Sequence, residues 1–514
     1  MFCALLRQFF NDTHDAAKAG IDLLLHDGTS VKVFVEFGMM LADEAALHSV
    51  YQCKGASGLK PCALCSNIFN RRTARDVVAR DSTGVARYHT CFDVNGIHLH
   101  TSDSLRAVAR RLSTAAAAGM TARNFAELET RLGFNFVPNG VMQDDELRAM
   151  ADPTAHLLYD TMHVYYVNGI FNNHVGRLME ALKPHGITYA VLATYVAHWN
   201  WPSRVKNKTG KDAVAGKRAE SSWKDGVFKC TASEALSLMP VLAQFVDAAV
   251  MGSASEDARR HGACFLLLAT AMELLEGSAR GKATPAELQR AIIAHLNAYK
   301  TLYGEDWMPI KFHLSIHFPM FLQRWGILPN CFVLERKHRM PKRYANEMRN
   351  TSRNWEANVL RECTAHHFAE FENNGPNHFQ GAACLVNPYT PKANARQKLI
   401  DELGIIAHDV AVTTSSTARI NEWEICSKGD VVLVAPQAAE QFVGQIQCFV
   451  ALQHEGVDAV FAGIRRWARL AAGARCSKWR RSDNLVIVAV DEISGSLIWA
   501  EAGGVVSVIS NSRL

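Results

Sequence analysis

The sequence predicts an α/β domain that carries a large all-α insertion, followed by a separate, small β-barrel-like domain at its C-terminal end. Two apolar runs, 31–41 and 156–159, have the length and composition of buried strands, and an aspartate follows each of them. Between residues 230 and 303 the apolar spacing is almost entirely helical. From residue 405 onwards, short β-rich runs alternate with Gly, Asp and Ser turns. These changes of period define the three regions.

The composition is that of a globular protein with a sizeable core, because 48% of the 514 residues are hydrophobic. No apolar run approaches the roughly 18 residues that a membrane span needs, and the first residues lack a leader-like pattern, so we expect neither a membrane partner nor secretion. The 13 cysteines are scattered along the chain, which favours a reducing compartment, the cytosol or the nucleus. A net charge of +5 permits a nucleic-acid partner without indicating one.

The first acid of interest stands at the end of a predicted strand. We expect a helix over 5–18, then strands over 21–25 and 31–41, and the second strand is apolar enough to be covered on both faces. That strand runs into Asp43, and 44–51 has helical spacing. An acid in this position can help to hold a metal ion. The alternative is that Asp43 is only the N-cap of the helix.

A second acid occupies the same kind of position later in the chain. The buried run 156–159 ends at Asp160, His163 follows after two residues, and helical spacing begins at Val164. An aspartate at the carboxyl end of a strand in an α/β fold faces the crevice in which ligands bind. On these residues alone, Asp160 as a helix cap and His163 as a partly buried histidine is the favoured interpretation.

Cysteine and histidine residues are concentrated between residues 53 and 103. Cys62 and Cys65 have the spacing of a zinc knuckle, and Pro61 favours the tight turn that such knuckles use. The same stretch offers further ligands for a tetrahedral zinc: Cys53, His89, Cys91, His98 and His100. The alternative is a pair of buried free thiols beside solvent-facing histidines.

Two histidines, His313 and His317, form a further candidate site. Their spacing of four residues places them on one face of a helix, where they can bind a metal ion. Because no third ligand lies nearby in the sequence, we favour packing or DNA contact for this pair.

Basic residues gather at two places that can contact a DNA backbone. Residues 202–218 are polar and basic with no apolar period, so we expect a mobile surface loop in which Lys206 and Lys208 face solvent or phosphates. Glu335 ends an apolar run and is followed by five basic residues: Arg336, Lys337, Arg339, Lys342 and Arg343. Such an acid can bind a divalent ion while the bases hold a polyanion. The alternative is an ordinary salt-bridging helix residue.

The β-rich domain, 405–514, follows a polar linker at 372–404. Bases and indoles are mixed in part of it: Arg465, Arg466, Trp467, Lys478, Trp479, Arg480 and Arg481. That pattern can stack on nucleic acid or follow its backbone, and a protein-interaction module fits it equally well.

Several of these motifs resemble one family in both sequence and order. The segment Leu158–His163, LYDTMH, resembles the LDVMH segment of plant CACTA-type (En/Spm) transposases, and more broadly the acid-x-x-His signature that hAT, CACTA and related DDE transposases share. Upstream, Asp43 to Ala46, Lys54-Gly55 and Cys62-x-x-Cys65 are similar to the Asp-x-Pro-Ala, Lys-Gly and Cys-x-x-Cys series of the CACTA group. Downstream, Lys311 to His317 resembles its HHLIH region, and Glu335 matches the glutamate of its PFERYMK segment.

The resemblance covers about 16–370 and implies an RNase H-like α/β domain with an incomplete sheet. The family's first catalytic aspartate lies well upstream of the second, and Asp27-Gly28 is too close to Asp43 to leave room for the intervening elements. We therefore expect a chain that begins after the first catalytic strand, as a truncated gene or transposon remnant would. The implied segments are RNase H-like parts at 1–52, 104–175 and 311–371, a Cys/His-rich insertion at 53–103, a helical insertion at 176–310, a linker at 372–404 and the β-rich domain at 405–514.

The resemblance also implies a mechanism and partners. Two-metal phosphoryl transfer with Mg²⁺ or Mn²⁺ would use Asp43 as the second catalytic aspartate and Glu335 as the third acid, beside the signature residues Asp160 and His163. It further implies DNA as the partner, a homo-oligomer and a location in the nucleus. Because the first acid is missing from its place, two alternatives stay open: a catalytically inactive DNA-binding remnant and a zinc-stabilised protein-interaction module.

Overall fold

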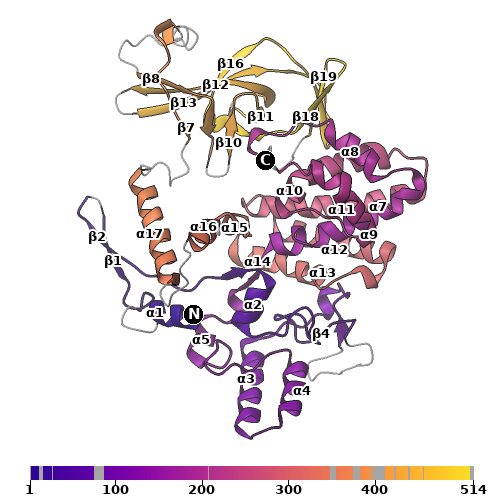
Figure 1. Ribbon diagram of the computed structural model, residues 1–514, viewed down its shortest axis with the longest axis vertical. Coiled ribbons are helices and arrows are strands. Elements are labelled where there is room, and N and C mark those ends of the chain that lie inside the picture. Colours follow the sequence, from indigo (N-terminus) through magenta and orange to yellow (C-terminus); the bar gives the residue numbers. More distant parts are fainter. Residues whose placement is uncertain are drawn as a thin grey trace. The chain divides into compact units, whose positions relative to one another are not determined.

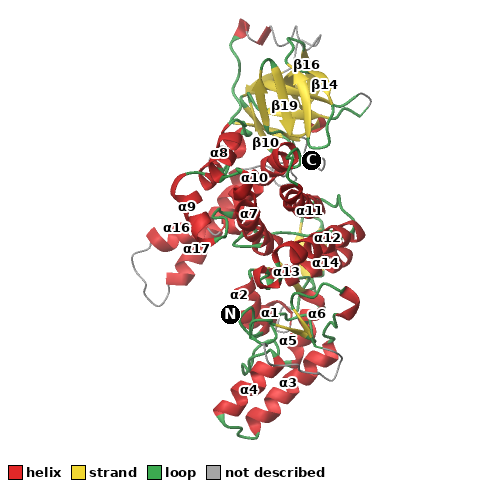
Figure 2. Cartoon of the chain, turned by 90° about the vertical axis from the view of Figure 1, so that its right-hand side faces the viewer, coloured by secondary structure: helices red, strands yellow, loops and turns green. Residues whose placement is uncertain are grey.

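The computed structural model is a mixed α/β protein that divides into two compact units (Figure 1). Met1–Arg177 with Thr270–Phe332 forms the first unit, and Leu178–Ala269 with Val333–Leu514 forms the second. The structure describes residues 2–10, 15–25, 27–73, 86–205, 208–337, 339–347, 355–373, 383–394, 396–397, 411–421, 424–437, 440–454 and 457–509. In Figure 2 most strands belong to one β domain, which lies in the C-terminal part of the second unit.

The first unit begins with a helix and an antiparallel hairpin. After α1 (Phe2–Phe10), β1 (Ile21–Leu24) pairs with β2 (Ser30–Val33). The single covered strand predicted for 31–41 is wrong in part. Phe34, directly after β2, is 60% exposed, and only Met40–Ala42 (β3) joins a second sheet. Apolar composition could not show this, because it does not reveal which elements cover a strand.

A short parallel pair of strands positions both acids. β3 pairs with β6 (Leu157–Tyr159) in a register that ends at Ala42↔Tyr159, so Asp43 and Asp160 follow their strands at the same edge. All three residues of β6 are buried, which accounts for its apolar sequence. α2 (Glu44–Tyr51) begins after Asp43. A π-helical turn (Met162–Tyr166) and α7 (Ile170–Leu182) follow Asp160. Both predicted strand-to-helix junctions are therefore present.

The Cys/His-rich segment and four helices lie between these junctions in the chain. β4 (Ile68–Phe69) pairs in parallel with β5 (Arg87–Tyr88). The helices that follow are α3 (Ser102–Ala117), α4 (Ala122–Leu132), α5 (Asp145–Met150) and α6 (Pro153–His156). Thr101 and Thr121 cap α3 and α4 by accepting the backbone N–H of the third helical residue.

A second helical layer completes the first unit. α11 (Glu256–Ser278) spans the division between the units and leads to α12 (Pro285–Tyr303), α13 (Lys311–Leu314) and α14 (Phe318–Trp325). α12 begins with a capping box, in which Thr284 and Glu287 exchange hydrogen bonds. α12 packs against α14. His313 and His317 lie between these two helices in the chain, on α13 and on the 3-10 turn Ser315–His317.

The helices of the second unit include the stretch for which a mobile loop was predicted. They are α8 (Tyr189–Ala197), α9 (Gly216–Asp225) and α10 (Ala232–Phe245). The prediction of a loop over 202–218 is wrong in part, because Lys211–Val214 forms a 3-10 turn and α9 starts two residues later. Ala213 and Val214 are buried, and two apolar residues are too few to produce a readable period.

One stretch in the described part of the chain, Ala232–Val250, is long and apolar enough to cross a membrane. It consists of α10 and the π-helical turn Val246–Val250, and 56% of it is buried inside the protein. The core helix of a soluble protein passes the same test of length and composition, so the stretch is weak evidence for a membrane span.

Three further helices lead to the β domain: α15 (Phe332–Lys337), α16 (Arg339–Glu347) and α17 (Trp355–Asn373). Three sheets follow. The first has the order β16-β13-β12-β11-β17, with β8 paired to β12. The second has the order β14-β15-β19-β18, and the third has the order β10-β9-β7. The strands are β7 (Cys384–Val386), β8 (Ala411–Ser415), β9 (Thr417–Arg419), β10 (Ile425–Ser427), β11 (Val431–Val434), β12 (Phe442–His454), β13 (Val457–Arg466), β14 (Ala468–Ala471), β15 (Cys476–Arg480), β16 (Leu485–Ala489), β17 (Ile493–Ser496), β18 (Trp499–Ala502) and β19 (Val505–Ile509).

The β domain departs from the prediction in two ways. Within the described residues none of its sheets closes into a barrel, because period-two patterns predict strands but not whether the outermost strands pair. In addition, β7 falls inside the predicted linker 372–404 and pairs with β9, so the β domain includes residues upstream of 405.

Candidate metal centre

Four side chains from two distant segments come together in the core of the first unit. Cys62, Cys65, His313 and His317 are all buried, and their ligand atoms lie within 4.8 Å of one another. The Sγ of Cys62 is 3.4 Å from the Nε2 of His317. The Sγ of Cys65 is 3.4 Å from the Nε2 of His313 and 3.5 Å from the Nε2 of His317. Two sulfurs and two imidazole nitrogens therefore face a common centre.

These separations fit four ligands around one tetrahedral ion. Zinc binds cysteine sulfur at about 2.3 Å and histidine nitrogen at about 2.0–2.1 Å, so a sulfur and a nitrogen at the tetrahedral angle are about 3.5 Å apart. The cluster could therefore hold a metal ion. A complete set of four protein ligands, which leaves no open position, is typical of a structural metal site.

Local structure brings each pair of ligands into position. The Nζ of Lys60 donates to the backbone oxygen of Ser66 at 2.8 Å and so closes the turn that carries both cysteines. Cys65 also forms a β-bridge with Leu99. His313 and His317 lie one helical turn apart, with ring centroids 5.2 Å from each other. The spacings visible in the sequence, Cys-x-x-Cys and four residues between histidines, thus produce two convergent halves of one site.

The electrostatics of the site favour the metal-binding forms of Cys62 and His313 and the protonated form of Cys65. Burial opposes ionisation of Cys62, but hydrogen bonds with Cys65 and His313 and the field of His317 outweigh it and lower the pKa of the Cys62 thiol well below its usual value. Burial and the Cys62 sulfur raise the pKa of Cys65 well above its usual value. Burial lowers the pKa of His313, which keeps the imidazole in the neutral, metal-binding form. A bound metal would stabilise both sulfurs as thiolates.

Tyr159 supports the cysteine ligands from β6. Its hydroxyl lies 3.6 Å from the Sγ of Cys62 and accepts the backbone N–H of Ala63 at 3.3 Å. Burial and the nearby sulfurs raise the pKa of Tyr159 well above its usual value. The hydroxyl therefore stays protonated and can donate a hydrogen bond to the Cys62 sulfur. β6, which precedes Asp160, therefore contacts the ligand cluster through Tyr159.

All five further zinc ligands that the sequence predicts, Cys53, His89, Cys91, His98 and His100, lie outside this cluster. Cys53 forms a β-bridge with Phe134, and burial raises the pKa of its thiol. His89 has its Nε2 2.9 Å from the backbone oxygen of Met308 and accepts the backbone N–H of Arg71 at its Nδ1. Cys91 lies 3.8 Å from a terminal nitrogen of Arg87.

In the structure, His313 and His317 take the place of these five predicted ligands. They are separated from the cysteines by 248 to 255 residues, so no local spacing rule could select them. Their spacing of four residues and the resemblance of Lys311–His317 to the HHLIH region are the sequence signals for this pair, and neither indicates the two cysteines as partners.

Asp160, His163 and Cys331 form a second group of potential ligands within 4.8 Å of one another. Oδ1 of Asp160 accepts the backbone N–H of Met162 at 3.3 Å and that of Cys331 at 2.9 Å. Oδ2 accepts the backbone N–H of His163 at 3.1 Å and faces the Nδ1 of the same residue at 2.5 Å. The side chain of Asp160 is 0% exposed, and that of His163 is 19% exposed.

This geometry makes Asp160 a structural acid. Each of its oxygens already has two N–H partners, so the carboxylate does not present the free oxygen that a catalytic magnesium ion requires. It closes the turn after β6 and orients the His163 ring, which agrees with the capping role favoured from the sequence.

Of the other two predicted catalytic acids, Asp43 has a structural position and Glu335 lies on the surface. Asp43 is the N-cap of α2 and accepts the backbone N–H of Ala46 at 2.6 Å. Glu335 is exposed on α15, and Val333–Leu514 belongs to the second unit. Among the described residues, neither Asp43 nor Glu335 belongs to a group of three or more potential metal ligands.

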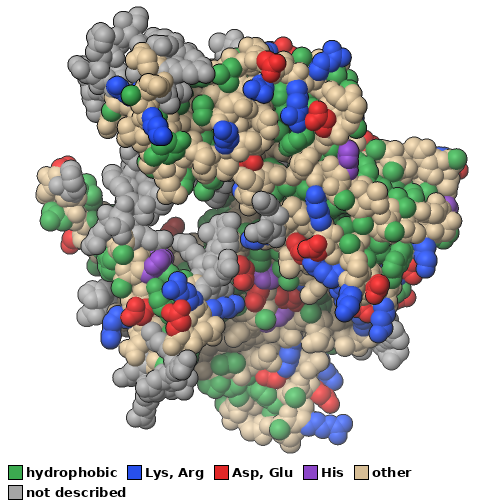
Figure 3. All heavy atoms as spheres, turned by 45° about the horizontal axis from the view of Figure 1, so that its top comes forward, with side chains coloured by type: hydrophobic (Ala, Val, Ile, Leu, Met, Phe, Trp, Pro, Cys, Tyr) green, Lys and Arg blue, Asp and Glu red, His purple; other side chains and the backbone are tan. Residues whose placement is uncertain are grey.

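The predicted DNA-binding residues are only partly described. Lys208, Lys342 and Arg343 are exposed, and Arg343 forms an ion pair with Glu347 at 2.9 Å. Lys206 and the side chains of Arg336, Lys337 and Arg339 lie outside the described residues. On the face drawn in Figure 3, positive and negative side chains are interspersed.

Trp467 and Trp479, the indoles of the predicted basic and aromatic pattern, are not available for stacking on bases. Trp467 is 2% exposed and Trp479 is 5% exposed, so both rings belong to the core of the domain. Around them, Arg465 and Arg481 form ion pairs with Asp483 and Glu501. The alternation of bases and indoles reflects a strand with one buried and one solvated face.

Comparisons with known proteins do not assign the chain to a family. No protein-family model matches it, and no curated protein matches it. The transposase resemblance therefore stays a prediction, and the function is argued from the site.

Proposed function

We propose that this chain is a zinc-stabilised, transposase-derived protein whose RNase H-like first unit binds DNA in the nucleus, as a homo-oligomer. The observation that carries the proposal is the meeting of two separate motifs. The Cys-x-x-Cys segment and the His-x-x-x-His segment each resemble the CACTA group, and they supply the two halves of one ligand cluster. Motifs that resemble one family by chance have no reason to lie in contact.

Zinc is the metal that fits this donor set best. Two thiolates and two imidazoles are the ligands of many structural zinc sites, and Cys62, Cys65, His313 and His317 would hold the ion. The ion would supply cross-linking rather than chemistry, because all four positions are filled by side chains. It would cross-link the Cys-x-x-Cys turn to α13 and to the 3-10 turn Ser315–His317. Tyr159, which contacts Cys62, would connect β6 to the same site.

DNA cleavage is a second candidate function, favoured by one observation. Asp43 and Asp160 follow neighbouring parallel strands at the same edge, which is where an RNase H-like site carries its acids. Against cleavage stands the hydrogen bonding of Asp160, which occupies both carboxylate oxygens. We therefore place DNA binding without cleavage first.

A nicking assay combined with a gel shift separates these functions. The purified chain is mixed with supercoiled DNA in Mg²⁺ or Mn²⁺, beside Asp43→Asn and Glu335→Gln. We expect no nicking, together with binding that weakens steeply as salt increases, because phosphate contacts release counterions. Nicking that both substitutions abolish while binding is retained would establish an active enzyme in place of our proposal. Absence of both activities would refute DNA binding and leave a zinc-stabilised interaction protein.

A further inference from the structure

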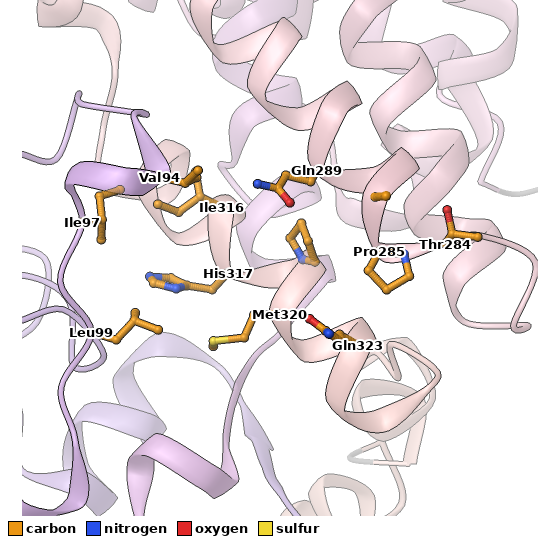
Figure 4. Close-up of a pocket in the computed structure, with 12 residues that line it drawn as sticks. Val94, Ile97, Leu99, Thr284, Pro285, Gln289, Ile316, His317, Met320 and Gln323 are labelled. Atoms are coloured by element: carbon orange, nitrogen blue, oxygen red, sulfur yellow. The ribbon is translucent and has the colours of Figure 1, made fainter.

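A pocket of about 500 Å³ opens beside the metal ligand His317 in the first unit (Figure 4). Its walls come from the segment 94–99, the start of α12, and the stretch 316–323, which runs from the 3-10 turn into α14. In Figure 4, Leu99, His317 and Met320 lie side by side along one wall. The volume falls within the range of about 300–1,000 Å³ that is usual for ligand pockets.

The lining is apolar and carries no acidic or basic chain. Val94, Ile97, Leu99, Ile316 and Met320 are among the lining residues, and within the described part of the chain no Asp, Glu, Lys or Arg lines the pocket. Such a surface does not compensate the desolvation of a phosphate, a carboxylate or an ammonium group. The occupant is therefore uncharged where it enters the pocket.

Two amide side chains give the pocket its polar contacts. Gln289 from α12 and Gln323 from α14 flank the apolar walls (Figure 4). A glutamine amide both donates and accepts hydrogen bonds, so it matches the N–H and C=O of a peptide group. Both glutamines are exposed, so a peptide segment that docks from solvent can reach their amides.

We propose that this pocket binds an aromatic side chain in a peptide segment of a partner protein. An aromatic ring fills an apolar pocket of this kind, as anchor residues do at protein interfaces, and the flanking peptide groups pair with Gln289 and Gln323. The rim supports this assignment, because Val94 is 38% exposed and Leu99 is 46% exposed. A docked segment would cover both. The inference goes beyond DNA binding and does not depend on it.

The position of His317 links the pocket to the metal cluster. His317 is 3% exposed, lines the pocket and faces both cysteine sulfurs. An occupant would cover the imidazole and restrict its movement away from the metal. This link, unlike the pocket itself, rests on the proposed zinc site.

The test uses N-acetyl-tryptophanamide, an indole flanked by two amides, with the zinc-loaded full chain and saturation-transfer NMR. We expect saturable binding that weakens at least fivefold in Leu99→Glu and in Val94→Glu. Val137→Glu is the matched control, since Val137 is 43% exposed in the same unit and does not line the pocket. Zinc content measured for each variant shows whether the fold and cluster are retained.

Three results would overturn the proposal. The first is no saturable binding by the parent chain, and the second is equal weakening by Val137→Glu. The third is binding of 3-methylindole as tight as that of N-acetyl-tryptophanamide, because the amides would then contribute nothing and the site would accept a small apolar molecule. Release of zinc to a chelator should slow at least twofold in saturating N-acetyl-tryptophanamide. If the probe binds but zinc is absent, the zinc proposal fails while the pocket proposal stands.

Discussion

The Nε2 of His317 lies 3.4 Å from the Sγ of Cys62, although 255 residues separate the two in the chain. A contact of this kind cannot arise from local structure and requires the first unit to be folded. Tyr159 joins the same cluster from β6, so three segments of the unit share one buried centre. The predictions below follow from this centre and from the buried charges around it.

Loss of one ligand should remove the metal and destabilise the first unit. We expect the parent chain to contain one zinc per molecule, and Cys65→Ser and His313→Asn to contain none. Free zinc at 1,000 times its dissociation constant contributes about 4 kcal/mol to the free energy of unfolding, so the variants should lose about that much. Zinc analysis and urea denaturation measure both effects. Cys53→Ser is the control, because Cys53 is equally buried and lies outside the cluster; loss of zinc from that variant would contradict the ligand assignment.

Removal of the Asp160 charge should destabilise the protein more than removal of the His163 ring. Asp160 accepts three backbone N–H groups and faces the His163 imidazole inside the core. Its replacement by asparagine leaves at least one donor facing an NH₂ group, at a cost of about 1–3 kcal/mol for each unsatisfied group. We expect Asp160→Asn to lose about 3 kcal/mol of the free energy of unfolding and His163→Gln to lose about 1 kcal/mol. Equal effects in urea denaturation would show that Asp160 has no special structural role.

Stability should decrease as the pH falls below 6.5, in part because of one buried histidine. Burial lowers the pKa of His295 to about 3, and its Nε2 lies 3.0 Å from the Nδ1 of the buried His174. In the unfolded chain the imidazole takes up a proton near its ordinary pKa of about 6.5, whereas in the folded chain it stays neutral. The contribution of His295 is therefore complete above pH 6.5 and is lost as the pH falls towards 3.

Between pH 6.5 and 5 the loss is about 2 kcal/mol, at about 1.4 kcal/mol for each pH unit. Urea denaturation at pH 7 and pH 5 should show a smaller difference for His295→Gln than for the parent chain. His198→Gln, at an exposed position, should retain the parent's difference. If His295→Gln keeps it as well, the buried imidazole is not the source.

A buried glutamate should stabilise the second unit. Glu424 is 4% exposed, forms an ion pair with the Nε of Arg204 at 3.0 Å, and accepts the backbone N–H of Ser496 at 3.1 Å. We expect Glu424→Ala to lower the free energy of unfolding by about 2–4 kcal/mol, because its donors lose a charged acceptor. Glu440→Ala removes an acid that is 75% exposed and 4.0 Å from Arg469, and should have an effect below about 0.5 kcal/mol. Denaturation curves that shift equally would contradict this distinction.

Local features of the fold could be predicted from the sequence. The strand-to-helix junctions at Asp43 and Asp160 and the capping box at Thr284 depend on neighbouring residues, and the structure contains all three. Which apolar runs are buried by other elements could not be predicted. Phe34 is exposed and Leu158 is buried, although both lie in apolar runs. What decides between them is contact with elements distant in sequence.

The candidate site shows the same division. Cys62 and Cys65 were identified as ligands because their spacing is local, and Cys53, His89 and Cys91 were proposed as their partners on the same ground. His313 and His317 complete the cluster through tertiary packing, which no spacing rule describes. The same holds for charged residues. Arg204 and Arg218 lie in a stretch that is basic in sequence, but tertiary structure pairs each of them with a glutamate.

The order of the ligands along the chain has a consequence during synthesis. A ribosome that adds about 5–20 residues per second needs about 13–50 seconds to pass from Cys65 to His317, which follows it by 252 residues. During that interval the two cysteines have been translated but their histidine partners have not. The nascent chain therefore carries the two cysteine thiols before the two histidines that complete the cluster. A chaperone or a reducing environment would have to protect the thiols from oxidation until the histidines have been translated.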